Sequence, residues 1–163
     1  MTFKETYILG LLLTLIMTSC DNLKPAGFWT TFKQDKIQSQ KSDQGPWGGF
    51  EEISWKENLS GEFSIKEILD FANAKDWRLV DSLSISKHDS IAITPKINMD
   101  DYSVEILLDR IKNALSWNEF KIYRFKTGWI KVEPGNARET DITGILAVKR
   151  DNKEIYVYHF WGE

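Results

Sequence analysis

Residues 120–161 read FKIYRFKTGWIKVEPGNARETDITGILAVKRDNKEIYVYHFW, and this stretch decides the fold. It is rich in β-branched and aromatic residues, which favour strands, and short stretches with glycine, proline, asparagine and aspartate interrupt it. The pattern predicts four strands, at 120–126, 129–133, 144–149 and 154–161. The connections are Thr127-Gly128, a polar loop over 134–141 and a turn over 150–153. Because connections this short join antiparallel neighbours, the sequence predicts a C-terminal β-meander.

The last of these strands is apolar on both faces. Alternate residues of a strand point to the same side, so Tyr156, Tyr158 and Phe160 share one face. The other face carries Ile155, Val157, His159 and Trp161. We expect one face to meet helices, and the other either to be covered by the segment around Trp47 and Phe50 or to form a patch for a partner, extended by Tyr123. The candidate partner-binding residues are Trp129, Tyr156, Tyr158, Phe160 and Trp161.

Two helices are predicted before the meander. Ser64 and Glu67 have the spacing of a capping box, and an apolar stripe at helical spacing follows as far as Lys75. This stripe consists of Ile65, Ile68, Leu69 and Ala72. Asp100 or Asp101 caps the second helix, whose stripe consists of Val104, Leu107, Leu108, Ile111 and Leu115. Between the helices, a strand over 77–85 and a short strand over 91–93 are expected. The predicted fold is α+β, with an antiparallel sheet, two helices on one face and a single domain over 47–163.

The N-terminus has the layout of an exported protein. Residues 1–20 read MTFKETYILGLLLTLIMTSC, a short charged start followed by an apolar run that is about half the length of a membrane-spanning helix. The ending Met17-Thr18-Ser19-Cys20 resembles the lipobox of bacterial lipoproteins. The resemblance implies a signal peptide over 1–19, cleavage before Cys20, and acyl chains on the Cys20 thiol and the new amino terminus. The alternative is an ordinary signal peptide with an incidental cysteine.

This resemblance also implies a location. The protein is expected in the cell envelope, anchored by lipid at Cys20 to the inner or the outer membrane, with its domain on the non-cytoplasmic side. Residues 20–46 are expected to form a flexible tether, since they are mostly polar and contain Pro25 and Gly27. The cluster Phe28-Trp29-Thr30-Thr31-Phe32 interrupts this tether. It either packs back on the domain, touches the lipid surface or is a binding motif.

The charge and the short motifs exclude several kinds of site. The net charge is −3, which argues against a nucleic-acid partner. Cys20 is the single cysteine and there are two histidines, His88 in a predicted turn and His159 on the last strand, so neither a metal site nor a cofactor is expected. No GxSxG motif is present. The adjacent acids Glu51-Glu52 and Asp100-Asp101 are more typical of turns and helix caps than of a glycosidase pair.

Three functions stay open at this point. The first is a non-catalytic protein-binding module, such as an inhibitor, an immunity-type protein or an envelope accessory protein. The second is a glycan-binding lipoprotein, because the chain has seven tryptophans and aromatic rings stack on sugars. The third is an envelope hydrolase, which would need a deep pocket that holds acids and His88 or His159. A flat apolar patch near Trp161 would favour the protein partner, and a groove with exposed rings would favour sugar.

Overall fold

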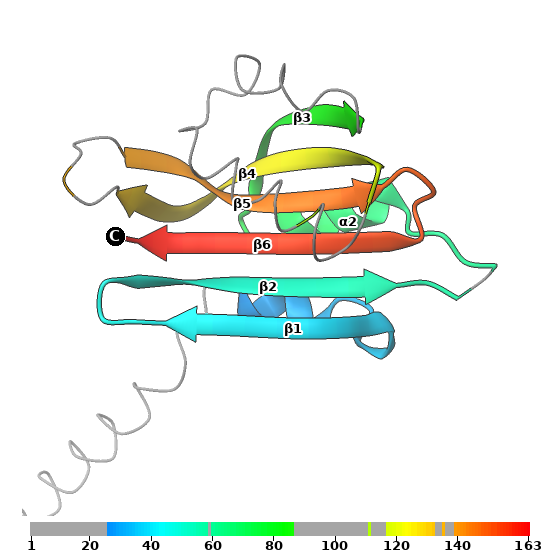
Figure 1. Ribbon diagram of the computed structural model, residues 1–163, viewed down its shortest axis with the longest axis horizontal. Coiled ribbons are helices and arrows are strands. Elements are labelled where there is room, and N and C mark those ends of the chain that lie inside the picture. The colour runs from blue at the N-terminus through cyan, green and yellow to red at the C-terminus, as the bar shows by residue number, and fades with distance from the viewer. Residues whose placement is uncertain (1–25, 59, 87–110, 112–116, 133–134, 136–138) are drawn as a thin grey trace, which may run out of the picture.

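The computed structural model describes residues 26–58, 60–86, 111, 117–132, 135 and 139–163. Its centre is one six-stranded sheet in the order β1-β2-β6-β5-β4-β3, and strands adjacent in this order run antiparallel (Figure 1). The end of β4 also pairs in parallel with β6, at Lys131 and Gly162. The strands are β1 (Ile37–Gln44), β2 (Gly48–Lys56), β3 (Arg78–Ser86), β4 (Glu119–Val132), β5 (Glu139–Lys149) and β6 (Glu154–Gly162). β4, β5 and β6 are consecutive neighbours and form a C-terminal meander.

The prediction of an α+β fold with two helices on one face of the sheet is wrong. The described residues are mostly antiparallel sheet and contain one α-helix, α2 (Ile65–Asn73), and two short 3-10 helices, η1 (Gly27–Thr31) and η2 (Gln34–Lys36). The second predicted helix lies outside the described residues apart from Ile111. The sheet is larger than expected because backbone pairing, which needs no apolar side chain, recruits a polar N-terminal segment as a strand.

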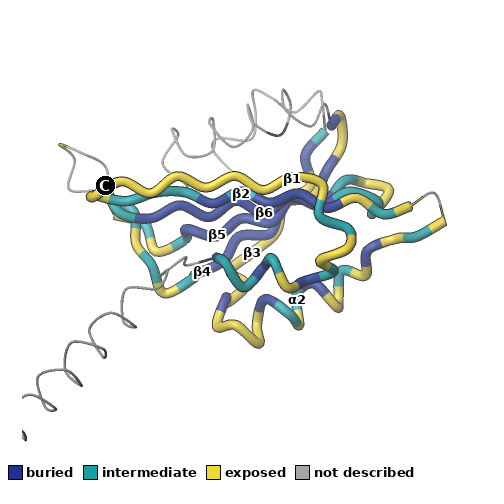
Figure 2. Tube along the Cα trace, turned by 90° about the horizontal axis from the view of Figure 1, so that it is seen from below, coloured by how far each residue is buried: buried dark blue, intermediate teal, exposed yellow. Residues whose placement is uncertain are grey.

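That segment is part of the predicted tether, and the structure corrects its assignment. β1 pairs along its length with β2, although seven of its eight side chains are exposed (Figure 2). Hydrophobicity does not reveal a strand at a sheet edge, since such a strand satisfies its backbone without burying side chains. The folded unit therefore begins well before residue 47.

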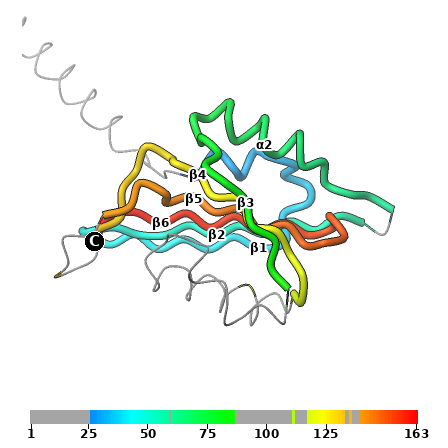
Figure 3. Tube along the Cα trace, turned by 90° about the horizontal axis from the view of Figure 1, so that it is seen from above, coloured from blue at the N-terminus to red at the C-terminus, as the bar shows by residue number. Residues whose placement is uncertain are grey.

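The aromatic cluster in the same segment packs back on the domain. Trp29 is fully buried, and its ring centroid lies 6.0 Å from that of Trp55 and 5.5 Å from that of Trp77. The Nε1 of Trp55 donates to the carbonyl of Phe32 at 2.8 Å. The segment with η1 lies on the same side of the sheet as α2 (Figure 3). Of the three alternatives for this cluster, packing on the domain is confirmed.

Two further predictions concern the start of a helix and the position of a turn. The N-cap at Ser64 is confirmed, because its side chain accepts from the Glu67 N–H at 3.4 Å. The return bond expected of a capping box is not formed, since the Glu67 carboxylate pairs with Lys33 at 3.1 Å. The helix α2 buries Ile68 and Ala72. The predicted turn at Thr127-Gly128 is wrong, since β4 continues through it. Gly128 has φ +81, and the pairing register with β5 shifts across this bend.

The sheet carries an apolar cluster on each face. Ile155 and Val157 lie in the cluster beneath α2 and η1, whereas Tyr156, Tyr158 and Phe160 lie in the opposite cluster with Ile111 and Trp117, and this division matches the predicted alternation in β6. All five β6 side chains are buried. Neither face of β6 is therefore an open apolar patch.

Candidate functional site

One side chain stands out on the surface by its exposure. Trp47 is 74% exposed, the largest exposed fraction among the big apolar side chains of the described residues. It lies in the turn between β1 and β2. The Gly45 N–H donates to the Gly48 carbonyl at 2.8 Å, and the Glu163 N–H donates to the Trp47 carbonyl at 2.7 Å. These two bonds hold the backbone on both sides of the Trp47 side chain.

Close glycine packing makes this turn rigid. A Cβ on Gly48 would collide with the carbonyl of Trp161, and one on Gly162 would collide with the carbonyl of Trp47. Gly162 also has φ +85, a backbone angle that residues other than glycine rarely adopt. The backbone of the turn and the end of β6 therefore approach more closely than any other residue type allows.

Beside Trp47 lies a hollow of about 410 Å³, here called the Trp47 hollow. It is lined by Asp43, Gly45, Pro46, Trp47, Gly48, Gly49, Phe50, Lys131, Tyr158, Phe160 and Glu163. The rings of Tyr158 and Phe160 lie 5.6 Å apart and are only 8% and 6% exposed, so they form its floor. No ion pair in the described part of the chain engages Asp43, Lys131 or Glu163. The hollow thus combines aromatic rings with three charged groups that find no charged partner among the described residues.

Two of the five candidate partner-binding residues, Tyr158 and Phe160, line this hollow. Trp161 is 7% exposed, and its ring lies 6.4 Å from that of half-buried Trp129. Trp161 follows Phe160 in β6 and stacks on His159, so it points to the other face of the sheet. Tyr156 is buried and donates its hydroxyl to Glu52 at 2.5 Å. The structure therefore does not bring the five residues together. Sequence reasoning missed Trp47, for which the signal was a tryptophan inside a Gly-Pro-Trp-Gly-Gly turn.

His159 lies in a closed polar cluster. It is fully buried, its Nε2 is 3.2 Å from the Oγ1 of Thr127 and 3.4 Å from the Oγ1 of Thr143, and the rings of Trp77 and Trp161 flank it at 5.3 and 5.1 Å. Burial lowers the pKa of His159 to about 3, because the imidazolium loses its hydration. Its Nδ1 has no hydrogen-bond partner among the described residues.

The acids near this cluster do not converge on an open site. Glu51 is the register partner of His159, is 1% exposed and accepts from Gln40 at 3.1 Å. Successive residues of a strand point to opposite faces, so Glu52 points away from Glu51 and contacts Tyr156 on the other face. None of the hollows described here is lined by His159. His88, Asp100-Asp101 and Cys20 lie outside the described residues.

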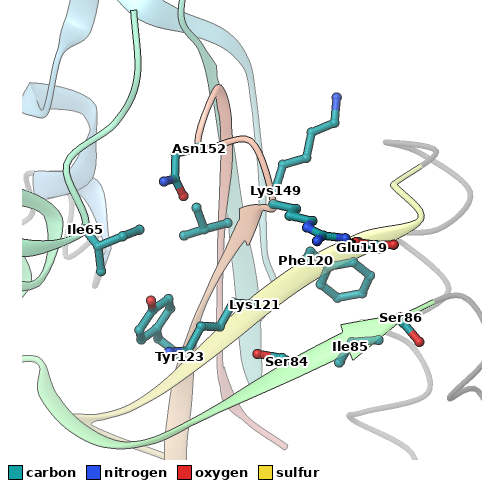
Figure 4. A pocket seen from close by; sticks show the side chains of 12 residues that line it. Ile65, Ser84, Ile85, Ser86, Glu119, Phe120, Lys121, Tyr123, Lys149 and Asn152 are labelled. Carbon is teal, nitrogen blue, oxygen red and sulfur yellow. Dashed lines mark hydrogen bonds and ion pairs between the residues drawn. The ribbon is translucent and has the colours of Figure 1, made fainter.

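A second hollow lies beside β3 and is here called the β3 trough (Figure 4). Its volume is about 380 Å³, and it is lined by Ile65, Ser84, Ile85, Ser86, Glu119, Phe120, Lys121, Tyr123, Val148, Lys149, Arg150 and Asn152. Ile65 at the start of α2 and the serines of β3 lie on opposite sides, with residues of β4 and β5 between them. The trough exists because Ser84 and Ser86 are small where α2 no longer covers the sheet.

The charged groups of the trough differ in how they are paired. Lys149 is bound to Glu154 at 2.6 Å, which raises the lysine pKa through this hydrogen bond, and Arg150 pairs with Glu119. Lys121 forms no ion pair in the described ranges, and its Nζ lies 5.0 Å from the ring centroid of Tyr123. Lys121 is therefore the cation of this trough that is available to an anionic group.

Neither a metal site nor a similarity to a known protein assigns a function to the described residues. Across the described residues, no group of three or more histidine, cysteine, aspartate or glutamate side chains is arranged to hold a metal ion. Among those same residues, no helix has the length and apolar character needed to span a membrane. No protein-family model, no curated protein and no solved structure matches this chain.

Proposed function

We propose that the protein is an exported, lipid-anchored and non-catalytic protein-binding module, such as an inhibitor, an immunity-type protein or an envelope accessory protein. We place its binding surface at the Trp47 hollow. The observation that carries this proposal is the exposed indole of Trp47 on a rigid glycine turn. Tryptophan is enriched among the few residues that dominate protein interfaces.

The rigidity of the turn supports a binding role for the exposed ring. Holding an apolar ring in water has no benefit for folding, whereas a ring that is fixed before binding loses little conformational entropy on association. The bond from the Glu163 N–H to the Trp47 carbonyl and the close approach of Gly48 to β6 fix the backbone that carries this ring. The hollow has about 410 Å³ beside the ring, enough to accept a partner side chain.

The anchor in this proposal rests on the sequence of residues 1–20 and its resemblance to lipoprotein signals. Two or three acyl chains would hold the protein firmly to a membrane, because each buried methylene contributes about 0.8 kcal/mol. Intact-mass measurement of the protein from its native membrane tests this part. The expected product begins at Cys20 and carries acyl chains, and an unmodified thiol or a retained leader would contradict it.

The binding surface is tested by photo-crosslinking in the native envelope. Trp47 is replaced by benzoylphenylalanine, and the matched control carries the same group at Asp151, an exposed residue of the β5–β6 turn. We expect a defined protein adduct from position 47 that is absent from position 151. The same adducts from both positions, or none from position 47, would contradict a protein-binding role for the hollow.

Glycan binding is the second candidate, and one observation favours it. The rings of Trp47 and Phe50 lie in the same hollow as the carboxylates of Asp43 and Glu163, which can accept hydrogen bonds from sugar hydroxyls. A glycan array probed with the wild type and with Trp47→Ala tests it. Signals on defined glycans that disappear in Trp47→Ala would support sugar as the ligand, and a blank array would remove this candidate.

A further inference from the structure

The outer edge of β3 is open in the part of the chain that the structure describes. β3 is the last of the described strands of the sheet, and its side chains from Arg78 to Ser82 are all exposed. The short strand expected over 91–93 lies outside the described residues. An edge strand presents unpaired N–H and C=O groups that can pair with another strand. β3 can therefore accept a further strand on this side.

β3 is more apolar than the edge at the other end of the sheet. Both edges expose two charged side chains, Lys41 and Asp43 on β1 and Arg78 and Asp81 on β3. β3 also exposes Leu79 at 47% and Val80 at 42%, whereas every exposed side chain of β1 is polar or charged. Proteins usually guard an edge with charges, and apolar side chains on an edge mark an interaction surface. β3 is therefore the edge that fits a partner.

The β3 trough adds side-chain selectivity to this edge. Ser84 lies directly across the strand pair from Lys121, so both side chains point into the trough on the α2 side of the sheet. A strand added outside β3 would lie about 4.8 Å beyond Ser84, since this is the spacing of neighbouring strands. An acidic side chain on that strand can reach across the small serine to the Lys121 ammonium.

We propose that β3 binds an extended peptide segment of a partner protein as an added strand, and that an acidic side chain of this segment enters the β3 trough to pair with Lys121. Main-chain hydrogen bonds would give the affinity, and the trough would give the specificity, as in other cases of strand addition. The site is separate from the Trp47 hollow and goes beyond the proposed function. The hollow lies at the end of β6, and the trough lies beside the turn that precedes β6.

The test uses the full chain and a displayed library of random nine-residue peptides. We expect the selected peptides to share an extended pattern of alternating residues, with aspartate or glutamate on one face. Lys121→Glu should weaken a selected peptide about tenfold, and exchanging its acid for lysine should restore binding to this variant. The matched control is Lys126→Glu, since Lys126 is an exposed lysine of the same strand that does not line the trough.

Backbone pairing is tested separately from charge. A selected peptide with N-methylated backbone amides should lose binding although its side chains are unchanged, and the unmodified peptide should slow amide exchange within Arg78–Ser86. Equal effects of Lys121→Glu and Lys126→Glu, no acidic preference, or protection outside β3 would overturn the proposal. Self-association through β3 without peptide selection would assign the edge to a second copy and would also overturn it. Trp47→Ala should leave peptide binding unchanged, so failure here and failure at the Trp47 hollow are distinguishable.

Discussion

Acid should destabilise the protein through His159. The side chain is fully buried, and burial lowers its pKa from 6.5 to about 3. Between these two values the unfolded chain takes up a proton at this histidine and the folded chain does not. Stability therefore rises with pH through this interval and is lost as the pH falls from about 6.5 toward about 3.

The size of the effect follows from the two pKa values. At about pH 4.5, which is two units below the unfolded pKa of 6.5, the histidine is protonated in the unfolded chain and neutral in the folded chain. Each unit corresponds to about 1.36 kcal/mol, so folding loses about 2.7 kcal/mol relative to about pH 7.5. The same mechanism contributes nothing above the unfolded pKa, where both states are neutral.

Urea unfolding of the wild type, His159→Gln and His88→Gln at both pH values provides the assay. Glutamine cannot ionise, and its amide can still bond to Thr127 and Thr143. We expect the loss of free energy of unfolding on acidification to be about 2.7 kcal/mol smaller in His159→Gln than in the wild type and in the His88→Gln control. If the wild type and His159→Gln lose the same amount, His159 is not held neutral by burial and the reasoning is refuted.

Three further predictions concern packing and use the same unfolding assay. Gly48→Ala should lower the free energy of unfolding by about 1–3 kcal/mol, because the new Cβ meets the Trp161 carbonyl. The control Gly45→Ala, whose Cβ would have its nearest atom at 3.7 Å, should change it by no more than about 0.5 kcal/mol. Equal losses in the two variants would contradict the tight turn. Trp29→Ala should cost about 3–5 kcal/mol because it empties a fully buried site, and a negligible cost would mean that this segment does not dock. Asp81→Asn should cost about 1–3 kcal/mol, since the buried guanidinium of Arg124 loses its anionic partner, and an unchanged midpoint would exclude this pair as a stabilising contact.

Part of the fold was predictable because local chemistry determines it. The alternation in β6 separates Val157 from Tyr158 onto opposite faces, and the structure has the same division. The N-cap at Ser64 marks the start of α2, since its side chain satisfies a backbone N–H that the helix itself leaves unbonded. These features depend on neighbours within a few residues, which a sequence displays directly.

The rest depends on long-range contacts that a sequence does not display. β1 is polar, and it forms a strand only because β2 offers it a backbone to pair with. Trp29 looked like an interruption in a tether, and its partners Trp55 and Trp77 are distant in the chain. Trp47 was missed as a site residue because aromatic content alone does not distinguish a core ring from an exposed one.

The exposed indole of Trp47 is the centre of this account, and NMR of the protein labelled with fluorotryptophan tests it most directly. The chain has seven tryptophans, and the signals of Trp47 and of buried Trp29 are assigned with single Trp→Phe variants. On addition of solubilised envelope proteins from the native host, the Trp47 signal should shift or broaden while the Trp29 signal stays unchanged. A Trp47 signal that does not respond, or one that moves only together with Trp29, would contradict a binding surface at this turn.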